Sequence, residues 1–351
     1  MRLIIVGTGA MARSHANAFA EIDGVSMVAA VDLNPDALSD FMAEFDIPRG
    51  FASLDEALAW GEFDAAANVT PDLIHHRTTM PLLRAGKHVL CEKPLASNHA
   101  DAVEMAKAAA DAGVVNMVNL TYRNVPAVMQ AAQMVRDGAI GDVRHFEASY
   151  LQSWLTQNAW GNWDKDPQWL WRLSTDHGSM GVLGDVGVHI LDFATLVAGA
   201  DVTSVSCRLQ TFEKAPDGKI GEYTLDANDS MAMHLALDSG AIGVLHASRF
   251  ASGHLNDLRL RIYGTLGGLD VRYEDAKSQL FISTGDDLLT GTWQPVDTPD
   301  VPTNFARFAK AVQDGEQVYP DFARGAALQQ VLDLALWSDT DQRRGQVVRA
   351  D

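Results

Sequence analysis

Residues 3–12 read Leu-Ile-Ile-Val-Gly-Thr-Gly-Ala-Met-Ala, a short apolar strand that runs directly into small residues at the start of a helical pattern. In this strand–turn–helix context Gly7 permits a tight turn, Gly9 lets the backbone approach a pyrophosphate, and Ala12 permits close packing of the helix on the strand. The N-terminus of the following helix attracts phosphate charge. The stretch therefore predicts a dinucleotide-binding turn, with cofactor contacts from Gly7, Thr8, Gly9, Ala10, Met11 and Ala12.

An acidic residue follows the next apolar strand. Asp32 ends the run Val28-Ala29-Ala30-Val31. A carboxylate at this place accepts hydrogen bonds from the adenosine ribose hydroxyls and repels a ribose 2′-phosphate. Arg13, at the start of the first helix, is a cation that could meet such a phosphate. Asp32 favours NAD as the cofactor and leaves NADP possible.

Up to about residue 120, short β-rich apolar runs alternate with helical patterns. This alternation predicts a doubly wound parallel sheet, the Rossmann arrangement, in the N-terminal part of an α/β protein. Helix starts are indicated by Asn34-Pro35, Ser53 and Asn98, and Gly113 is a typical helix end. The expected strands are 3–6, 26–31, 64–69, 88–90 and 114–119, and the expected helices are 36–45, 54–60 and 99–112.

Beyond Tyr122 the pattern changes, because strands follow one another with turn residues between them. This succession predicts a C-terminal α+β domain with an open, mainly antiparallel sheet. We expect residues 1–121 to form the NAD(P)-binding domain and 122–351 the substrate-binding and oligomerisation domain, with the alternative that the C-terminal helices pack back toward the first. The expected hairpins are 231–237 with 242–248 and 258–263 with 269–273, and the expected helices are 125–135, 304–312 and 322–338.

The composition is that of a globular protein. With 351 residues and 47% hydrophobic content the chain can bury a large core. Its formal net charge of −19 would repel a phosphate backbone, so nucleic acid is not an expected partner. Cys91 and Cys207 are the two cysteines and indicate neither a disulfide framework nor a zinc site. No apolar run has the length of a signal peptide or a membrane span, so we expect no membrane contact and a cytoplasmic location.

A second candidate site follows the strand that ends at Leu90, where the sequence continues Cys91-Glu92-Lys93-Pro94. Ligands of an open parallel sheet bind beyond the carboxyl ends of its strands, so Lys93 is a candidate to reach the nicotinamide. The alternative is a solvated loop lysine. Thr70-Pro71 follows the end of another strand and resembles a turn that borders the adenine or diphosphate side of the cofactor, with His75 on the helix that follows. The alternative is that Thr70-Pro71 caps this helix and that His75 is a partly exposed histidine. Further predicted cofactor contacts are Thr70, Pro71, His75, Glu92 and Lys93.

The third candidate site is the segment 184–192, where Asp185, His189 and Asp192 fall on one face if the segment is helical. The remaining positions are largely apolar, which predicts a polar stripe that lines a cavity. Histidine can accept a hydroxyl proton near neutrality. The alternative is that Asp185 caps the helix and His189 is a core histidine. A metal site that adds His177 is less favoured because the ligand spacing is missing, and no metal is predicted.

Four stretches together identify a family. Residues 7–12, 85–96, 140–143 and 184–189 make the chain resemble the Gfo/Idh/MocA oxidoreductases, which include glucose-fructose oxidoreductase and inositol dehydrogenase. The resemblance implies a Rossmann domain followed by a domain whose open sheet often serves in oligomerisation, hence a homodimer or homotetramer. It also implies that Lys93 contacts the nicotinamide ribose and the reacting hydroxyl, that His189 is the acid/base and that Asp185 orients the substrate. A cis peptide bond at Lys93–Pro94 is implied as well.

The substrate is indicated by aromatic residues. Five of the eight tryptophans lie between Tyr150 and Arg172, interleaved with amide and carboxylate side chains. Flat rings can cover the C–H face of a sugar or cyclitol while polar groups bind its hydroxyls. The alternative is a loop pinned by its indoles to the core or to a neighbouring subunit. The predicted substrate contacts are Lys93, Tyr122, Arg123, Tyr150, Gln152, Trp154, Arg172, His177, Asp185 and His189.

These observations predict an NAD(P)-dependent oxidoreductase that transfers a hydride between the nicotinamide and a secondary alcohol or ketone of a sugar, sugar derivative or cyclitol. Two alternatives stay open. One is a non-catalytic nucleotide-binding sensor, and the other is an NADPH-dependent keto-sugar reductase.

Overall fold

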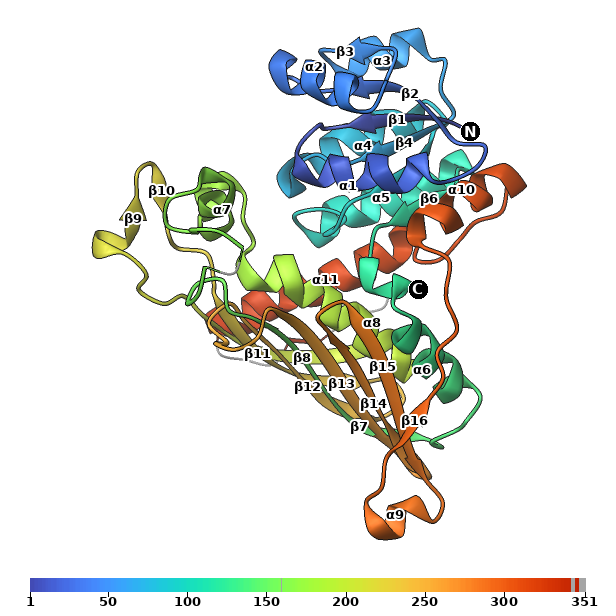
Figure 1. Ribbon diagram of the computed structural model, residues 1–351, viewed down its shortest axis with the longest axis vertical. Helices are drawn as coiled ribbons and strands as arrows, with labels where there is room; N and C mark the ends of the chain where they lie inside the picture. The colour runs from blue at the N-terminus through green and yellow to red at the C-terminus, as the bar shows by residue number, and fades with distance from the viewer. Residues whose placement is uncertain (159, 342–344, 347–351) are drawn as a thin grey trace. The chain divides into compact units, whose positions relative to one another are not determined.

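The computed structural model describes residues 1–158, 160–341 and 345–346, and the chain divides into two compact units (Figure 1). The first unit contains residues 1–120 and also Pro302–Gln329, and the second contains the rest. A segment near the C-terminus thus belongs to the first unit, which is the arrangement given above as the alternative. The reason is α10 (Asn304–Asp314), whose Phe305 and Phe308 pack into the hydrophobic core of the first unit.

The first unit is built on a six-stranded parallel sheet in the order β3-β2-β1-β4-β5-β6, which confirms the predicted Rossmann arrangement. The expected strands are present with small shifts at their ends. The sequence pattern missed β3 because it has only two residues, too few to show a period. The strands are β1 (Arg2–Val6), β2 (Ser26–Val31), β3 (Gly50–Phe51), β4 (Ala65–Asn68), β5 (His88–Cys91) and β6 (Asn116–Val118).

The helices of the first unit begin where polar caps predicted them. Asn34 accepts hydrogen bonds from the first backbone N–H groups of one helix, and Ser53 and Asn98 do the same at two others. Gly113 ends its helix in the left-handed conformation that favours glycine. The helices are α1 (Ala10–Ala20), α2 (Pro35–Glu44), α3 (Leu54–Trp60), α4 (His75–Arg84) and α5 (His99–Ala112), with a short turn η1 (Asp72–Ile74) before α4.

The second unit is built on a nine-stranded sheet in the order β16-β15-β14-β13-β7-β12-β11-β8-β17. Its pairs are antiparallel except for β12 with β7, which are parallel, so the prediction of a mainly antiparallel sheet is confirmed. Both expected hairpins are present, as β11 with β12 and β13 with β14. The strands are β7 (Val143–Gln152), β8 (Val202–Gln210), β11 (Ser230–Leu237), β12 (Ile242–Ser248), β13 (Asn256–Gly264), β14 (Gly267–Glu274), β15 (Lys277–Thr284), β16 (Gln294–Val296) and β17 (Gly345–Gln346).

Two helices cover one face of this sheet, α6 (Pro126–Arg136) against β14 and β15 and α8 (Val188–Ala198) against β7 and β13 (Figure 1). The segment 184–192 is helical but not one α-helix, because Leu183–Gly187 (η5) forms a π-helical turn that leads into α8. Gly184 and Gly187 lie in this turn, where a side chain would collide with Met180 or crowd Met231. Asp185 therefore lies on the π-helical turn, and His189 and Asp192 lie on α8.

Short elements complete the second unit. They are η2 (Thr121–Asn124), α7 (Pro167–Leu170), η3 (Trp171–Leu173), η4 (Thr175–His177), η6 (Pro216–Gly218), β9 (Lys219–Ile220), β10 (Tyr223–Thr224) and α9 (Asp287–Thr290). The long helix α11 (Phe322–Asp341) begins in the first unit and ends in the second. None of the described helices is both long and apolar enough to cross a membrane.

Candidate active site

The glycine-rich turn after β1 has the shape that a pyrophosphate requires. Gly7 has a φ of +89°, and a Cβ atom there would lie 2.8 Å from the Val69 carbonyl oxygen. Gly9 caps α1 without a side-chain hydrogen bond, and a Cβ at Gly9 would meet nothing within 4 Å. The first turn of α1 carries no acidic residue. Its backbone N–H groups therefore fit an anionic group at the helix N-terminus.

Asp32 is held beside this turn. One carboxylate oxygen accepts hydrogen bonds from the backbone N–H and the hydroxyl of Thr8, both at 2.8 Å, and the other accepts from the Asn34 N–H at 2.8 Å. Arg13 donates to Glu44 at 2.8 Å, so its charge is engaged by a carboxylate. A fixed anion at Asp32 and a paired Arg13 fit the ribose hydroxyls of NAD better than a 2′-phosphate.

Glu92 anchors the backbone of Lys93. Its buried carboxylate accepts from His15 Nε2 at 2.7 Å and Asn119 Nδ2 at 2.6 Å through one oxygen, and from the Lys93 backbone N–H at 3.1 Å through the other. Asn304 extends the network, because its Nδ2 donates to Asn119 Oδ1 at 3.1 Å. The carboxylate that the sequence predicted as a cofactor contact is thus bonded to protein groups.

The charge of Glu92 is stable in these surroundings. Burial raises the pKa of a carboxyl group, but the hydrogen bonds from His15 and Asn119 and the charge of Lys93 outweigh burial and lower the pKa of Glu92 to about 2. The sequence did not single out His15 or Asn119. A histidine three residues beyond the glycine turn is the one signal that could have drawn attention to this network. The Lys93–Pro94 peptide bond is cis, as the family resemblance implied.

The predicted contacts at the end of β4 form a second buried network. The Thr70 hydroxyl donates to Asn68 Oδ1 at 2.7 Å, and both ring nitrogens of His75 lie against backbone carbonyls. Pro71 is exposed and precedes η1. Since protein carbonyls occupy both nitrogens of His75, its imidazole has none left for a direct hydrogen bond to a cofactor.

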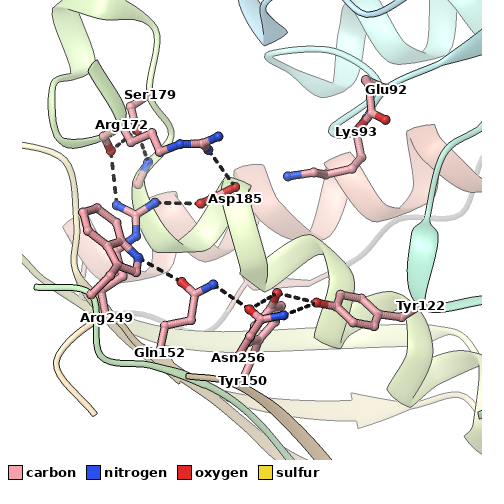
Figure 2. Close-up of polar contacts among 12 residues, drawn as sticks. Glu92, Lys93, Tyr122, Tyr150, Gln152, Arg172, Ser179, Asp185, Arg249 and Asn256 are labelled. Carbon is pink, nitrogen blue, oxygen red and sulfur yellow. Dashed lines mark hydrogen bonds and ion pairs between the residues drawn. The ribbon is translucent and has the colours of Figure 1, made fainter. Parts of the chain in front are cut away.

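In the second unit, Asp185 lies between two arginines (Figure 2). Its carboxylate accepts from Arg249 at 3.0 Å and from Arg172 at 3.4 Å. Arg249 is completely buried, and Arg172 keeps 29% of its side chain exposed. Two adjacent guanidinium groups favour the ionised form of a carboxyl group. Asp185 is therefore arranged as a fixed hydrogen-bond acceptor.

Arg249 is a neighbour of Asp185 that the sequence did not reveal. It also donates to the Arg172 carbonyl at 3.1 Å, and its guanidinium lies 5.0 Å from the ring centre of Trp154. Burial lowers the pKa of Arg249, while the charge of Asp185 acts against that shift. A single arginine after β12 carries no motif, so only the structure links it to Asp185.

A polar network links Gln152 and Tyr150 of β7 to Asn256 of β13 and Tyr122 of η2 (Figure 2). Trp154 Nε1 donates to Gln152 Oε1 at 3.2 Å, and Gln152 Nε2 donates to Asn256 Oδ1 at 2.9 Å. Asn256 Oδ1 also accepts from the Tyr150 hydroxyl at 2.8 Å, and its Nδ2 donates to the Tyr122 hydroxyl at 3.2 Å. The two tyrosine hydroxyls share a further hydrogen bond. The structure thus brings three predicted substrate contacts together around Asn256, and Trp154 joins them through Gln152. The sequence did not single out Asn256.

His189 lies at the tyrosine end of this network. It is 7% exposed on α8, and its ring packs edge-on against Tyr122 with ring centres 4.9 Å apart. Burial raises the pKa of Tyr122 to about 12, and it raises the pKa of Tyr150 well above its usual value. Both phenols are therefore neutral at physiological pH and can donate or accept hydrogen bonds.

Other predicted residues have mainly structural partners. Arg123 and Asp192 form a buried two-bond ion pair at 2.7 Å, which ties η2 to α8. The exposed His177 bonds to Ser174 at 2.9 Å and packs on Tyr223. Within the described part of the chain, no three His, Cys, Asp or Glu side chains converge as metal ligands would.

The tryptophan-rich segment packs as a small hydrophobic core of its own. Trp154, Leu155, Leu170, Leu173 and Leu225 are buried together, and partly buried neighbours surround them. This is the packing expected if the indoles pin the loop. The partly buried apolar neighbours are Trp160, Trp163, Trp169, Ala215, Ile220, Tyr223 and Phe250.

Comparison with known proteins decides the family. Residues 1–120 match the oxidoreductase family model with an NAD-binding Rossmann fold, and residues 128–270 match the GFO/IDH/MocA C-terminal domain. The chain belongs to the Gfo/Idh/MocA oxidoreductase family. The chain is therefore an NAD(P)-dependent oxidoreductase, and the turn around Gly7 and Asp32 fits NAD.

Several relatives within the Gfo/Idh/MocA family align over nearly the whole chain. Levoglucosan dehydrogenase of Pseudarthrobacter phenanthrenivorans is 26% identical over 92% of this chain and 91% of its own. The 4-carboxy-2-hydroxymuconate-6-semialdehyde dehydrogenase of a Sphingobium species is 27% identical over 92% of this chain and 94% of its own. An oxidoreductase domain protein from Kribbella flavida has a similar structure, with a TM-score of 0.89, 28% identity and 99% coverage of both chains. Inositol dehydrogenases are among the further relatives.

Proposed function

We propose that this protein transfers a hydride between the nicotinamide of NAD and a secondary alcohol or ketone of a sugar, sugar derivative or cyclitol. The observation that carries the proposal is the polar network of the second unit, in which Asp185, Gln152 and Tyr122 are held by partners beside aromatic rings. Polar side chains next to flat rings are typical of sites for polyhydroxylated rings. The relatives that act on an anhydrosugar or on inositols point the same way.

The proposed roles follow from what alcohol oxidation requires. The carbon loses a hydride, the oxygen loses a proton, and a C=O double bond forms. Bound NAD supplies the hydride acceptor. His189 takes the hydroxyl proton, because an imidazole can accept and return a proton near neutral pH.

Lys93 and Asp185 act by charge rather than by proton transfer. The Lys93 ammonium stabilises the negative charge that develops on the reacting oxygen. The Asp185 carboxylate already bonds to Arg172 and Arg249. With its remaining acceptor capacity it binds substrate hydroxyls, and so it orients the substrate ring. In the reverse direction the same groups would return a proton to a ketone oxygen, so direction depends on substrate and cofactor levels.

The experiment is a spectroscopic screen of NAD and NADP reduction over inositols, aldoses, glycosides and anhydrosugars. We expect turnover with at least one polyhydroxylated ring, with NAD used better than NADP. A dicarboxylic semialdehyde should be included, because one relative acts on such a compound. Absence of turnover with every polyol, despite measurable NADH binding, would favour the sensor. Turnover only of keto-sugars with NADPH would favour the reductase.

We also propose that the face of the large sheet opposite α6 and α8 forms a homodimer or homotetramer contact. A shallow pocket on the second unit is lined by alternate strand residues that include Glu147, His246, Arg259 and Arg261. An open sheet face of this size is a typical subunit contact in antiparallel proteins. Light scattering should give a mass of two or four chains, and a monomer at micromolar concentration would contradict the proposal.

A further inference from the structure

His75 is held between two groups that can only accept hydrogen bonds. It lies at the N-terminus of α4 and its imidazole is fully buried. Nδ1 lies 2.8 Å from the Pro94 carbonyl oxygen, and Nε2 lies 2.7 Å from the Thr70 carbonyl oxygen. A neutral imidazole carries one N–H, whereas the imidazolium carries two. Only the doubly protonated ring can donate to both oxygens.

The other arrangements of the ring are unfavourable. A neutral ring would place a nitrogen lone pair against a carbonyl lone pair at hydrogen-bond distance, at a buried position where unmade hydrogen bonds are costly. A ring flipped by 180° would put carbon atoms against both carbonyls and lose both bonds. The two distances therefore favour this orientation of the ring, and they point to the doubly protonated form.

The groups around the ring are compatible with a buried cation. Cys91 from β5 and Asp72 from η1 are the titratable groups that face His75 from the neighbouring elements. Burial disfavours the imidazolium, but Cys91, Asp72 and the Pro94 carbonyl outweigh burial and raise the pKa of His75 to about 10. The Asn68 amide donates to Thr78 and Thr79, so these neighbouring polar groups bond to one another.

The two carbonyls belong to loops that follow adjacent strands. β4 and β5 pair in parallel with Asn68 opposite Cys91, and Thr70 and Pro94 lie just beyond these ends. We propose that His75 is a permanently protonated positioning residue, which fixes the Lys93–Pro94 backbone to the loop after β4 by donating to both carbonyls. The inference rests on the proposed function only for the role of Lys93; the protonation state does not depend on it.

The protonation state is tested on the cofactor-free protein by ¹⁵N NMR of the histidine rings. At pH 8 we expect both nitrogens of His75 to show the shifts of protonated nitrogen. His76 is the matched reference signal, because it is the next residue and its Nε2 lies 3.0 Å from the exposed carboxylate of Glu104 rather than between two buried carbonyls. A neutral spectrum for His75 at pH 8 overturns the inference, whatever substrate the protein uses.

The positioning role is tested with His75→Gln, which keeps a donor but cannot become a cation, and with His76→Gln as the control. We expect His75→Gln to lower kcat by about tenfold or more, because small displacements of a reacting group are costly. The Kd for NADH, measured by fluorescence, should stay near the wild-type value. A folded His75→Gln with unchanged kcat overturns the positioning role. If the variant does not fold, the NMR result still decides the protonation state.

The pH dependence of stability gives a third readout. The folded pKa of His75, about 10, lies above the usual value of 6.5. Its contribution to stability is therefore fully present below about pH 6.5 and is lost as the pH rises through the folded pKa. The difference in Tm between wild type and His75→Gln should shrink from pH 7 to pH 10. A difference that stays constant over this range overturns the inference.

Discussion

The surroundings of Lys93 and of Asp185 are built in different ways. In the first unit, Glu92 and His75 bond to the backbone at Lys93 and Pro94, and both follow the ends of adjacent parallel strands. In the second unit, Asp185 is held by side chains, Arg172 thirteen residues before it and Arg249 sixty-four residues after it. The loops that follow adjacent parallel strands bring together residues close in sequence, whereas Asp185 in η5 meets Arg172 of η3 and also Arg249 after β12, which is distant along the chain.

This difference predicts which property, stability or substrate use, a substitution near each site changes first. Around Lys93 a substitution should affect the folded backbone and the stability of the unit, because buried polar groups lose hydrogen-bond partners. Around Asp185 a substitution should affect substrate use first, because only side-chain orientation changes. The following predictions test this contrast. The first concerns Lys93 and His189, whose substitution should reduce kcat to a similar extent.

Lys93→Met and His189→Ala should have the largest effects. Each should reduce kcat by about 10²–10⁴-fold, because one removes the charge at the developing oxyanion and the other removes the proton acceptor. Steady-state kinetics would measure the loss, and fluorescence titration should give a Kd for NADH close to that of the wild type. Lys107→Met, which removes an exposed lysine paired with Asp111, is the control. Full activity in either variant would reject the assignment.

Glu92→Gln should destabilise the protein by about 1–3 kcal/mol at pH 7, because the His15 and Asn119 bonds lose their charged acceptor. The folded pKa of Glu92, about 2, lies below the usual 4.5, so the ionised carboxylate contributes stability above about pH 4.5 and loses it as the pH falls toward 2. Urea unfolding from pH 7 to pH 3 would measure both effects. Glu104→Gln, on the surface, should show neither. Equal unfolding free energies of Glu92→Gln and wild type at pH 7 would mean that this network does not support the Lys93 loop.

Arg249→Lys should lower kcat/KM by about tenfold, or 1.4 kcal/mol. A lysine keeps the charge but lacks the two separate guanidinium nitrogens, one of which donates to Asp185 and the other to the Arg172 carbonyl. Most of the change should be a rise in KM, and Asp185→Ala should show the same pattern. Arg144→Lys, at the exposed pair with Asp142, is the control. A fall in kcat alone would show that Asp185 acts in the chemical step rather than in orientation.

Tyr122→Phe should have the smallest effect. The phenylalanine keeps the ring contact with His189 and removes the hydroxyl that bonds to Asn256 and Tyr150. We expect a cost of about 0.5–1.5 kcal/mol in stability, with KM changed more than kcat. Thermal unfolding and steady-state kinetics would measure both. A loss of kcat as large as that of His189→Ala would instead place the tyrosine among the proton-transfer groups.

The sequence was most informative where function depends on local geometry. The turn at Gly7, the acid at Asp32 and the lysine after β5 each have a motif with a physical reason, and the parallel sheet followed from the alternation of strands and helices. The same reasoning missed β3, which is too short to show a period, and it did not predict the π-helical turn at Leu183–Gly187. Roles for Lys93, Asp185 and His189 remain predictions for the experiments above.

The sequence by itself determined the family, the two kinds of sheet and the dinucleotide turn, because these depend on residues close together in the chain. Only the tertiary structure brought Arg249 to Asp185, Asn256 to Gln152 and Tyr122, and His15 to Glu92. It also placed His75 between two carbonyls. Such contacts depend on strand register and on buried hydrogen bonds that must be satisfied, and no spacing along the chain encodes them.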